Sequence, residues 1–181
     1  MTFTETRLKG CFVLEPNVFK DERGYFFESY NKEIFQEGIG AEVNFVQDNQ
    51  SFSTKRVIRA IHYQTGDYAQ AKLVRVLQGI VLDVVVDLRK DSITFGQHIA
   101  IELSDTNKKQ VFIPRGFGHG FITLSESAEF FYKCDNYYNK EAEGGIVFND
   151  PTLDIDWRIA SDKIKASERD LNLPLLSQAI L

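Results

Sequence analysis

The stretch IPRGFGHGF, residues 113–121, does more than any other to decide the fold. It separates an apolar run that ends at Ile113 from a second run that begins at Gly120. Its glycines permit a tight turn in which the backbone can approach a ligand closely. His119 follows this turn directly, so the stretch predicts two β-strands with an imidazole at the start of the second.

Short runs of the same kind continue in both directions along the chain. Each is apolar or alternating, and Gly, Asp, Asn, Ser or Pro separates it from the next, which is the pattern of an antiparallel sandwich or barrel. Read together with residues 72–79, the stretch 113–121 resembles the second conserved motif of the cupins, and this resemblance implies a double-stranded β-helix, or jelly-roll barrel. The expected strands span residues 10–19, 25–30, 44–50, 57–64, 71–76, 80–88, 96–102, 110–113, 120–124 and 128–136.

Helices are expected in two places only. Asn31 can cap a helix from residue 31 to 37. The pattern changes after Trp157, and a helical tail from about residue 158 is expected to pack on the barrel. The length of 181 residues fits a single domain, 1–181. The sequence therefore predicts a mainly β protein with a few short peripheral helices.

Composition narrows the classes of partner. The formal net charge is −5 with both signs interspersed, so no basic face indicates nucleic acid or an anionic membrane. No apolar run approaches the ~18 residues that a membrane span needs, and no signal peptide is visible. Cys11 and Cys134 match no metal or redox spacing. We therefore expect buried free thiols and a cytoplasmic location.

The segment RVIRAIHYQ, residues 56–64, delivers an imidazole on an apolar strand. Arg59 and His62 are three residues apart, which places them on opposite faces of the strand unless a β-bulge intervenes. A cupin metal site normally takes two histidines from an H-x-H, but Tyr63 and Gln64 follow His62 here. A metal ion would lack its usual ligands, so no metal is predicted.

A series of segments resembles the dTDP-4-dehydrorhamnose 3,5-epimerase family over nearly the whole chain. The most specific motifs are D-E-R-G-x-F-x-E, Q-D-N and I-P-x-G-F-x-H-G-F, which occur together here. The matching segments are FKDERGYFFESYN (19–31), NFVQDNQS (44–51), VIRAIHYQ (57–64), AKLVRVLQG (71–79), VVVDLRKDSITFGQ (84–97), LSDTNKKQVFIPRGFGHGF (103–121), AEFFYKCDNYY (128–138) and FNDPTLDIDW (148–157).

The resemblance implies an epimerase whose base is His62 and whose acid is Tyr132. Asp170 is implied as the carboxylate of a histidine dyad, which fixes the imidazole tautomer and favours the imidazolium. A proton next to a ketone is too weakly acidic for imidazole unless a fixed cation stabilises the enolate oxygen, and Lys72 fits this role. Tyr132 would return a proton on the opposite face.

The implied reaction converts dTDP-4-dehydro-6-deoxy-D-glucose to dTDP-4-dehydro-L-rhamnose, in dTDP-L-rhamnose biosynthesis, without a cofactor. Relatives are dimers in which an N-terminal strand crosses to the partner, and the aromatic run YFFESY at 25–30 suits this exchange. Phe26 and Tyr138 are candidates to sandwich the thymine. The substrate-binding residues implied are Arg23, Phe26, Glu28, Gln47, Asp48, Asn49, Arg59, His119, Tyr138, Glu143 and Arg169.

Three positions depart from the family pattern. Arg169 stands where relatives usually have lysine, Ala60 replaces a glycine, and Gly118 replaces an alanine. Other functions on the same scaffold stay open, namely a C3-only epimerase and a non-catalytic protein that binds sugar nucleotides. A 3,4-ketoisomerase is disfavoured because its histidine pair near His62 is absent.

Overall fold

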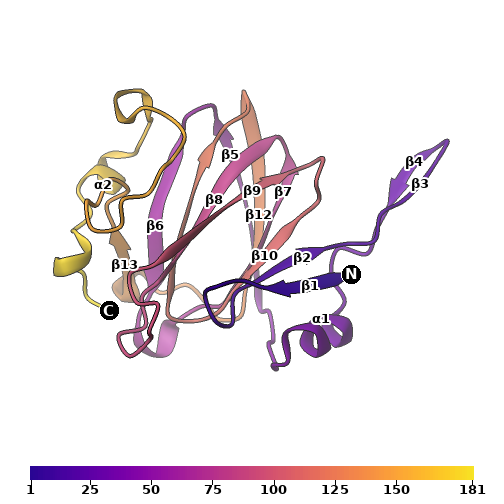
Figure 1. Ribbon diagram of the computed structural model, residues 1–181, viewed down its shortest axis with the longest axis horizontal. Coiled ribbons are helices and arrows are strands. Elements are labelled where there is room, and N and C mark those ends of the chain that lie inside the picture. The colour runs from indigo at the N-terminus through magenta and orange to yellow at the C-terminus, as the bar shows by residue number, and fades with distance from the viewer.

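The computed structural model describes residues 1–181 apart from the side chain of Ala60. Two antiparallel sheets face each other as a barrel (Figure 1). The larger sheet contains, in order, β1 (Thr2–Glu5), β2 (Phe12–Glu15), β10 (Gln110–Ile113), β7 (Lys72–Gln78), β12 (Ser127–Cys134) and β5 (Gln47–Thr54). The smaller contains β13 (Glu143–Ile146), β6 (Ile58–Gln64), β11 (Phe117–Thr123), β8 (Ile80–Asp87) and β9 (His98–Ser104). This confirms the predicted mainly β, cupin-type barrel.

The barrel is closed by apolar side chains from both sheets. On β8, Val81 and Val85 point inward and join a buried cluster that includes Phe121 and Phe130. The residues between them, such as Val84, point outward into a second buried cluster. Because both faces of the smaller sheet are covered, β8 is a nearly continuous apolar run.

The C-terminal tail covers the outer face of the smaller sheet. Trp157 is buried there and donates a hydrogen bond from Nε1 to the Phe148 carbonyl at 2.8 Å. The tail holds only short helical pieces, namely η3 (Ser161–Lys163), α2 (Glu168–Leu171) and η4 (Leu176–Gln178). The apolar tail residues Ile159, Ile164, Leu173, Ala179 and Leu181 pack on the outer cluster.

Helix α1 (Lys32–Ile39) forms where the sequence predicted it. The Asn31 side chain accepts from the backbone N–H groups of Glu33 and Ile34, and Gly40 ends the helix in a left-handed conformation with φ of 67°. Phe35 and Ile39 are buried beneath the larger sheet. Two further single turns are η1 (Gly66–Tyr68) and η2 (Lys140–Ala142).

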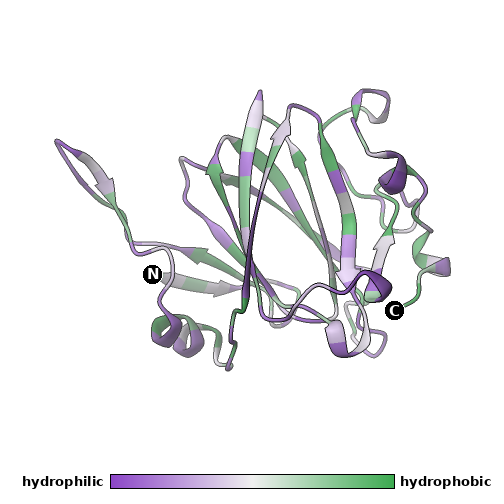
Figure 2. Ribbon diagram, turned by 180° about the vertical axis from the view of Figure 1, so that it is seen from behind, coloured by the Kyte–Doolittle hydropathy of each residue, from purple (hydrophilic) through white to green (hydrophobic). Residues whose placement is uncertain are grey.

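A two-stranded hairpin, β3 (Phe19–Asp21) and β4 (Gly24–Phe26), projects away from the barrel with a hydrophilic tip (Figures 1 and 2). The single strand predicted at residues 10–19 is therefore two strands, because Pro16 lies between them and lacks an N–H. Phe19 and Phe26 are exposed, and Tyr25 stacks on Phe27 with ring centres 6.0 Å apart. None of the helices described has the length and apolar character that crossing a membrane requires.

Candidate active site

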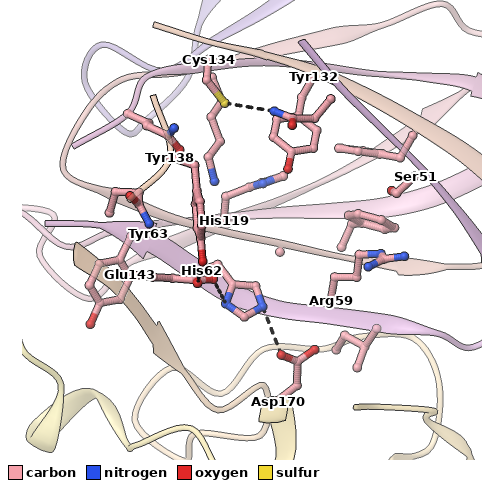
Figure 3. Close-up of a pocket in the computed structure, with 18 of the residues that line it drawn as sticks. Ser51, Arg59, His62, Tyr63, His119, Tyr132, Cys134, Tyr138, Glu143 and Asp170 are labelled. Atoms are coloured by element: carbon pink, nitrogen blue, oxygen red, sulfur yellow. Dashed lines mark hydrogen bonds and ion pairs between the residues drawn. The ribbon is translucent and has the colours of Figure 1, made fainter. Parts of the chain in front are cut away.

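A cavity of about 630 Å³ opens between the two sheets. Its wall is mostly polar where β5, β6, β7, β12, β13 and α2 meet, and apolar where Phe121 and Phe130 form the floor. Of the residues implied by the family resemblance, the cavity is lined by Gln47, Asn49, Arg59, His62, Lys72, His119, Tyr132, Tyr138, Glu143, Arg169 and Asp170. Figure 3 shows several of these side chains converging on one space.

A β-bulge in β6 brings Arg59 and His62 to the same face. His119 on β11 pairs with His62, and Phe121 pairs with Arg59, so a three-residue step on β6 lies opposite a two-residue step on its partner. The extra residue reverses the alternation. Ile58 and Ile61 accordingly lie in the outer apolar cluster while Arg59 lines the cavity. Simple alternation, which would separate Arg59 from His62, fails at this bulge.

His62 is held by a carboxylate from the tail. Its Nε2 lies 3.1 Å from Asp170 Oδ1, and the Asp170 side chain is only 8% exposed. Ser167 caps α2 by accepting from the Asp170 N–H at 3.1 Å, which fixes the start of the helix. The other ring nitrogen, Nδ1, forms no hydrogen bond with any residue that the structure describes and lies 4.0 Å from Glu143 Oε1. Only one nitrogen is therefore committed to a dyad.

Lys72 and Tyr132 face His62 from the other sheet, on the neighbouring strands β7 and β12. The Lys72 Nζ atom lies 5.9 Å from the centre of the Tyr132 ring. Burial lowers the pKa of Lys72, although the negative charges of Asp83 and Glu143 oppose this effect. Burial also raises the pKa of Tyr132, so its hydroxyl keeps a proton to donate.

A hydrogen-bonded group stands at the mouth of the cavity. Glu143 Oε2 accepts from the Tyr138 hydroxyl at 2.6 Å and pairs with Arg169 Nη2 at 2.7 Å. Burial would raise the pKa of Glu143, but the hydrogen bonds from Arg169 and Tyr138 outweigh it and keep this pKa below its usual value. Gln47 joins the group by accepting from the Tyr138 N–H at 3.2 Å.

Two residues in or beneath the cavity were missed by the sequence reasoning. Asp83 lies 2.7 Å from His119 Nε2 and is 1% exposed. The signal for it was present, since an aspartate interrupts the apolar strand IVLDVVVD. Cys134 lines the cavity as well. Burial raises the pKa of the Cys134 thiol to about 11, so it is no thiolate nucleophile at neutral pH.

Asp48, which the family resemblance implied for substrate binding, does not line the cavity. It lies between Gln47 and Asn49 on β5, so strand alternation turns it to the opposite face of the sheet. There its carboxylate pairs with Lys133 at 3.0 Å instead of lining the cavity. Two of the three residues of the Q-D-N motif therefore line the cavity of this chain.

Three other predicted residues, Arg23, Phe26 and Glu28, lie on or next to the projecting hairpin and do not line the cavity of their own chain. The Arg23 guanidinium pairs with Asp21 on the same hairpin. Among the described residues no group of three or more His, Cys, Asp or Glu side chains is arranged to hold a metal ion. The replacement at Ala60 concerns a side chain outside the described part of the chain.

The arrangement defines a class of protein: a cupin barrel whose cavity has a histidine–aspartate pair on one wall and a tyrosine and a lysine on the opposite wall, residue types suited to proton transfer at a carbon atom. The chain belongs to the dTDP-4-dehydrorhamnose 3,5-epimerase family, whose model matches residues 5–178. It is thus an isomerase that epimerises carbohydrates.

Relatives support this assignment over the full length of the chain. The dTDP-4-dehydrorhamnose 3,5-epimerase of Salmonella typhimurium is 52% identical over 181 residues, which is all of this chain and 98% of that protein. The crystal structure of the Elizabethkingia anophelis enzyme is 53% identical, with a TM-score of 0.94 over 98% of this chain and 97% of that one. A Legionella pneumophila epimerase in complex with dTDP-4-keto-L-rhamnose is 44% identical, with a TM-score of 0.94 over 98% and 93%.

Proposed function

We propose that this enzyme inverts C3 and C5 of dTDP-4-dehydro-6-deoxy-D-glucose and forms dTDP-4-dehydro-L-rhamnose for dTDP-L-rhamnose biosynthesis. The observation that carries the proposal is the His62 and Asp170 pair on one wall of a cavity whose opposite wall carries Lys72 and Tyr132. The Legionella pneumophila epimerase holds dTDP-4-keto-L-rhamnose, which is the product expected here, and this supports the choice of substrate.

The first step is removal of a proton beside the ketone. The His62 imidazole takes the proton from carbon, and the electron pair moves onto the ketone oxygen to form an enolate. The Lys72 ammonium stabilises this oxygen, and its partly buried position strengthens the interaction because less water screens it than at the surface. Asp170 orients the imidazole and stabilises the imidazolium that results.

Inversion requires that the new proton arrive from the other side of the ring. His62 belongs to the smaller sheet and Tyr132 to the larger, so a sugar bound between the sheets presents one face to each. The Tyr132 hydroxyl donates its proton to carbon as the enolate collapses back to the ketone. We therefore assign His62 as the base on one face of the sugar and Tyr132 as the acid on the other.

The nucleotide part of the substrate is assigned to the mouth of the cavity. Arg59 and Arg169 supply guanidinium groups suited to bidentate contact with a diphosphate. Arg59 is oriented by a hydrogen bond from Nε to the Ser53 hydroxyl at 3.2 Å. Tyr138 is half exposed at the entrance, where its ring can stack on the thymine. Gln47, Asn49, Glu143 and His119 complete the proposed substrate contacts.

The proposed assembly is a homodimer that exchanges the projecting hairpin. The exposed faces of Phe19 and Phe26 need cover, and an exposed strand edge favours pairing with another chain. In this arrangement Arg23, Phe26 and Glu28 complete the partner's cavity. We place the enzyme in the cytoplasm, in agreement with the two free, buried cysteines. Neither nucleic acid nor a membrane is proposed as a partner.

The decisive experiment incubates the enzyme with dTDP-4-dehydro-6-deoxy-D-glucose in deuterated water and follows C3 and C5 by NMR. Incorporation of deuterium with inversion at both carbons is the expected result. Incorporation at C3 alone would establish a C3-only epimerase, and binding of the substrate without exchange would establish a non-catalytic protein. His62→Ala should lower the exchange rate by roughly 10²- to 10⁴-fold. If that variant keeps its activity, His62 is not the base.

A further inference from the structure

Asp83 is a buried charge that the fold does not explain. It points into the barrel from β8, between the inward side chains of Val81 and Val85. One of its oxygens, Oδ1, lies 2.7 Å from His119 Nε2. The other, Oδ2, is buried and finds no hydrogen-bond partner in the described part of the chain. A buried carboxylate that makes a single hydrogen bond lowers the stability of the fold. We therefore expect Asp83 to have a role other than stabilising the barrel.

A second aspartate on the same strand shows what a structural carboxylate looks like here. Asp87 is fully buried, and its oxygens accept from Arg89, Ser92 and Thr94 at distances of 2.6 to 3.1 Å. These bonds close the loop that follows β8. Asp83 makes no comparable set of hydrogen bonds. Its one hydrogen-bond contact is with His119, which lines the cavity, so a role in the cavity is the better explanation.

The His119 ring is held in one orientation. Asp83 engages its Nε2, and the Phe130 ring stacks against it at 5.9 Å with an interplanar angle of 26°. His119 pairs with His62 across the strands, so the two imidazoles are neighbours on the inner face of the smaller sheet. With Nε2 committed to Asp83, Nδ1 is the nitrogen left for a ligand. Four groups therefore follow one another along this side of the cavity: Asp170 on α2, His62 on β6, His119 on β11 and Asp83 on β8.

From this geometry we infer that Asp83 is a positioning residue for the epimerisation: it orients His119 toward the substrate and places a carboxylate on the side of the cavity that faces the Lys72 ammonium. The inference rests on the proposed function. When the proton leaves carbon for His62 and the electron pair moves to the ketone oxygen, Lys72 is the cation that stabilises that oxygen, while His119 holds the sugar beside it. The Asp83 carboxylate fixes the His119 ring and favours the charged form of Lys72 before the enolate forms.

The surroundings of Lys72 support this role. Lys72 is partly buried, and desolvation lowers its pKa, whereas the negative charges of Asp83 and Glu143 raise it. Loss of the Asp83 charge would therefore make the neutral amine more favourable. A neutral amine stabilises an enolate much less than an ammonium does, so the effect of Asp83 would appear in the chemical step rather than in nucleotide binding.

The test compares Asp83→Asn with Asp87→Asn, two nearly isosteric changes on one strand. For Asp83→Asn we expect kcat to fall about 10- to 100-fold, while the Kd for dTDP stays within about twofold because dTDP lacks the sugar. The melting temperature should fall less than in Asp87→Asn, which removes more hydrogen bonds but should keep the kcat of the folded protein. Asp83→Ser serves as a second variant if the amide does not fold.

A double-mutant cycle with His119→Gln tests whether Asp83 acts through that residue. We expect Asp83→Asn to reduce kcat much less in the His119→Gln background than in the wild type. The inference is overturned if Asp83→Asn and Asp83→Ser keep wild-type kcat, or if kcat falls only in proportion to the folded fraction. Deuterium exchange by the wild type distinguishes the proposed function from the role of Asp83. If the wild type shows no exchange, the proposed function is refuted. If it does, the Asp83 variants test the role of Asp83 alone.

Discussion

At the scale of single residues, the barrel interior contains charges that a structural core would not use. Lys72 is partly buried on β7, and Asp83 is buried on β8 opposite apolar neighbours. A buried ammonium or carboxylate lowers stability unless it is fully paired. Mutations that remove such groups commonly raise stability and lower activity. Charges placed this deep are therefore the clearest residue-level sign of chemistry in the molecule.

Lys72→Met tests the electrostatic role of the ammonium. Activity should fall by about 100-fold or more, because the enolate oxygen loses a fixed positive charge. The pKa of Lys72 is lowered by burial from about 10.5, so the unfolded chain binds more protons between the two values. Wild-type stability should therefore rise with pH through that window. Urea unfolding at several pH values should show a smaller slope for Lys72→Met than for the control Lys55→Met, whose side chain is solvated.

Gly118→Ala tests the departure from the alanine of relatives. A Cβ placed there lies 2.5 Å from Ile61 Cγ2 and 2.9 Å from Leu88 Cδ1, so buried side chains must move. Overpacking of this kind costs about 1 to 3 kcal/mol. In the Ile61→Ala background the same change should cost clearly less, as measured by chemical denaturation. Equal costs in both backgrounds would show that Ile61 is not the obstacle.

At the scale of elements, the tail contributes Asp170, which contacts His62 in the cavity, and is therefore part of the candidate site. Asp150 is buried and accepts from the Leu176 N–H at 2.7 Å, and the Tyr63 hydroxyl donates to the Ile180 carbonyl at 3.0 Å. These bonds tether the chain on the far side of α2, which carries Asp170. The position of the dyad carboxylate therefore depends on contacts that lie further along the tail.

Asp150→Asn tests this dependence. The variant places an amide N–H₂ or a weaker acceptor where a charged oxygen meets the Leu176 N–H, and a hydrogen bond to a charged group is worth about 1.5 to 3 kcal/mol. We expect a lower melting temperature and a lower kcat, with the affinity for dTDP largely kept. Asp156→Asn is the control, since Asp156 is exposed and bonds only to the neighbouring Arg158 N–H. Comparable loss of kcat in the control would contradict the proposed tether.

The elements also show what the sequence alone could predict. Alternation and turn residues predicted most strands, and Asn31 located the start of α1. The bulge in β6 carries no local sequence signal, because it depends on the register against β11. The pairing of His62 with Asp170 joins residues 108 positions apart, so only the family resemblance pointed to it. Strand alternation places Asp48 outside the cavity, a detail that the motif alone did not show.

At the scale of the whole molecule, the hairpin is the element that does not fit a monomer. It extends from the barrel with exposed aromatic rings, and the residues implied for substrate binding on it lie away from the cavity of their own chain (Figure 1). The family resemblance predicted both the hairpin residues that bind substrate and the exchange of the hairpin between subunits. The sequence of one chain, however, cannot show whether these residues reach its own cavity or that of a partner. The single-domain boundary, 1–181, likewise stays a prediction.

Complementation in mixed dimers tests the exchange. Arg23→Ala and His62→Ala should each be nearly inactive alone. When the two variants are co-expressed, a mixed dimer contains one intact site, and random pairing should restore about a quarter of wild-type activity. His62→Ala with Tyr132→Phe is the control, because both residues line the cavity of one chain and no intact site can form. Recovery no greater than in this control would show that the hairpin serves its own chain.

The placement of His62 and Tyr132 on separate sheets has a consequence for proton balance. In the proposed mechanism, each inversion leaves one proton too many on His62 and one too few on Tyr132, and the cavity separates the two residues. The site must be reset before it can act again. Because burial raises the pKa of Tyr132, the tyrosinate regains a proton readily, and water that enters the cavity is the available carrier. Each inverted carbon should therefore carry hydrogen from the solvent, and each conversion at two carbons requires two such resets.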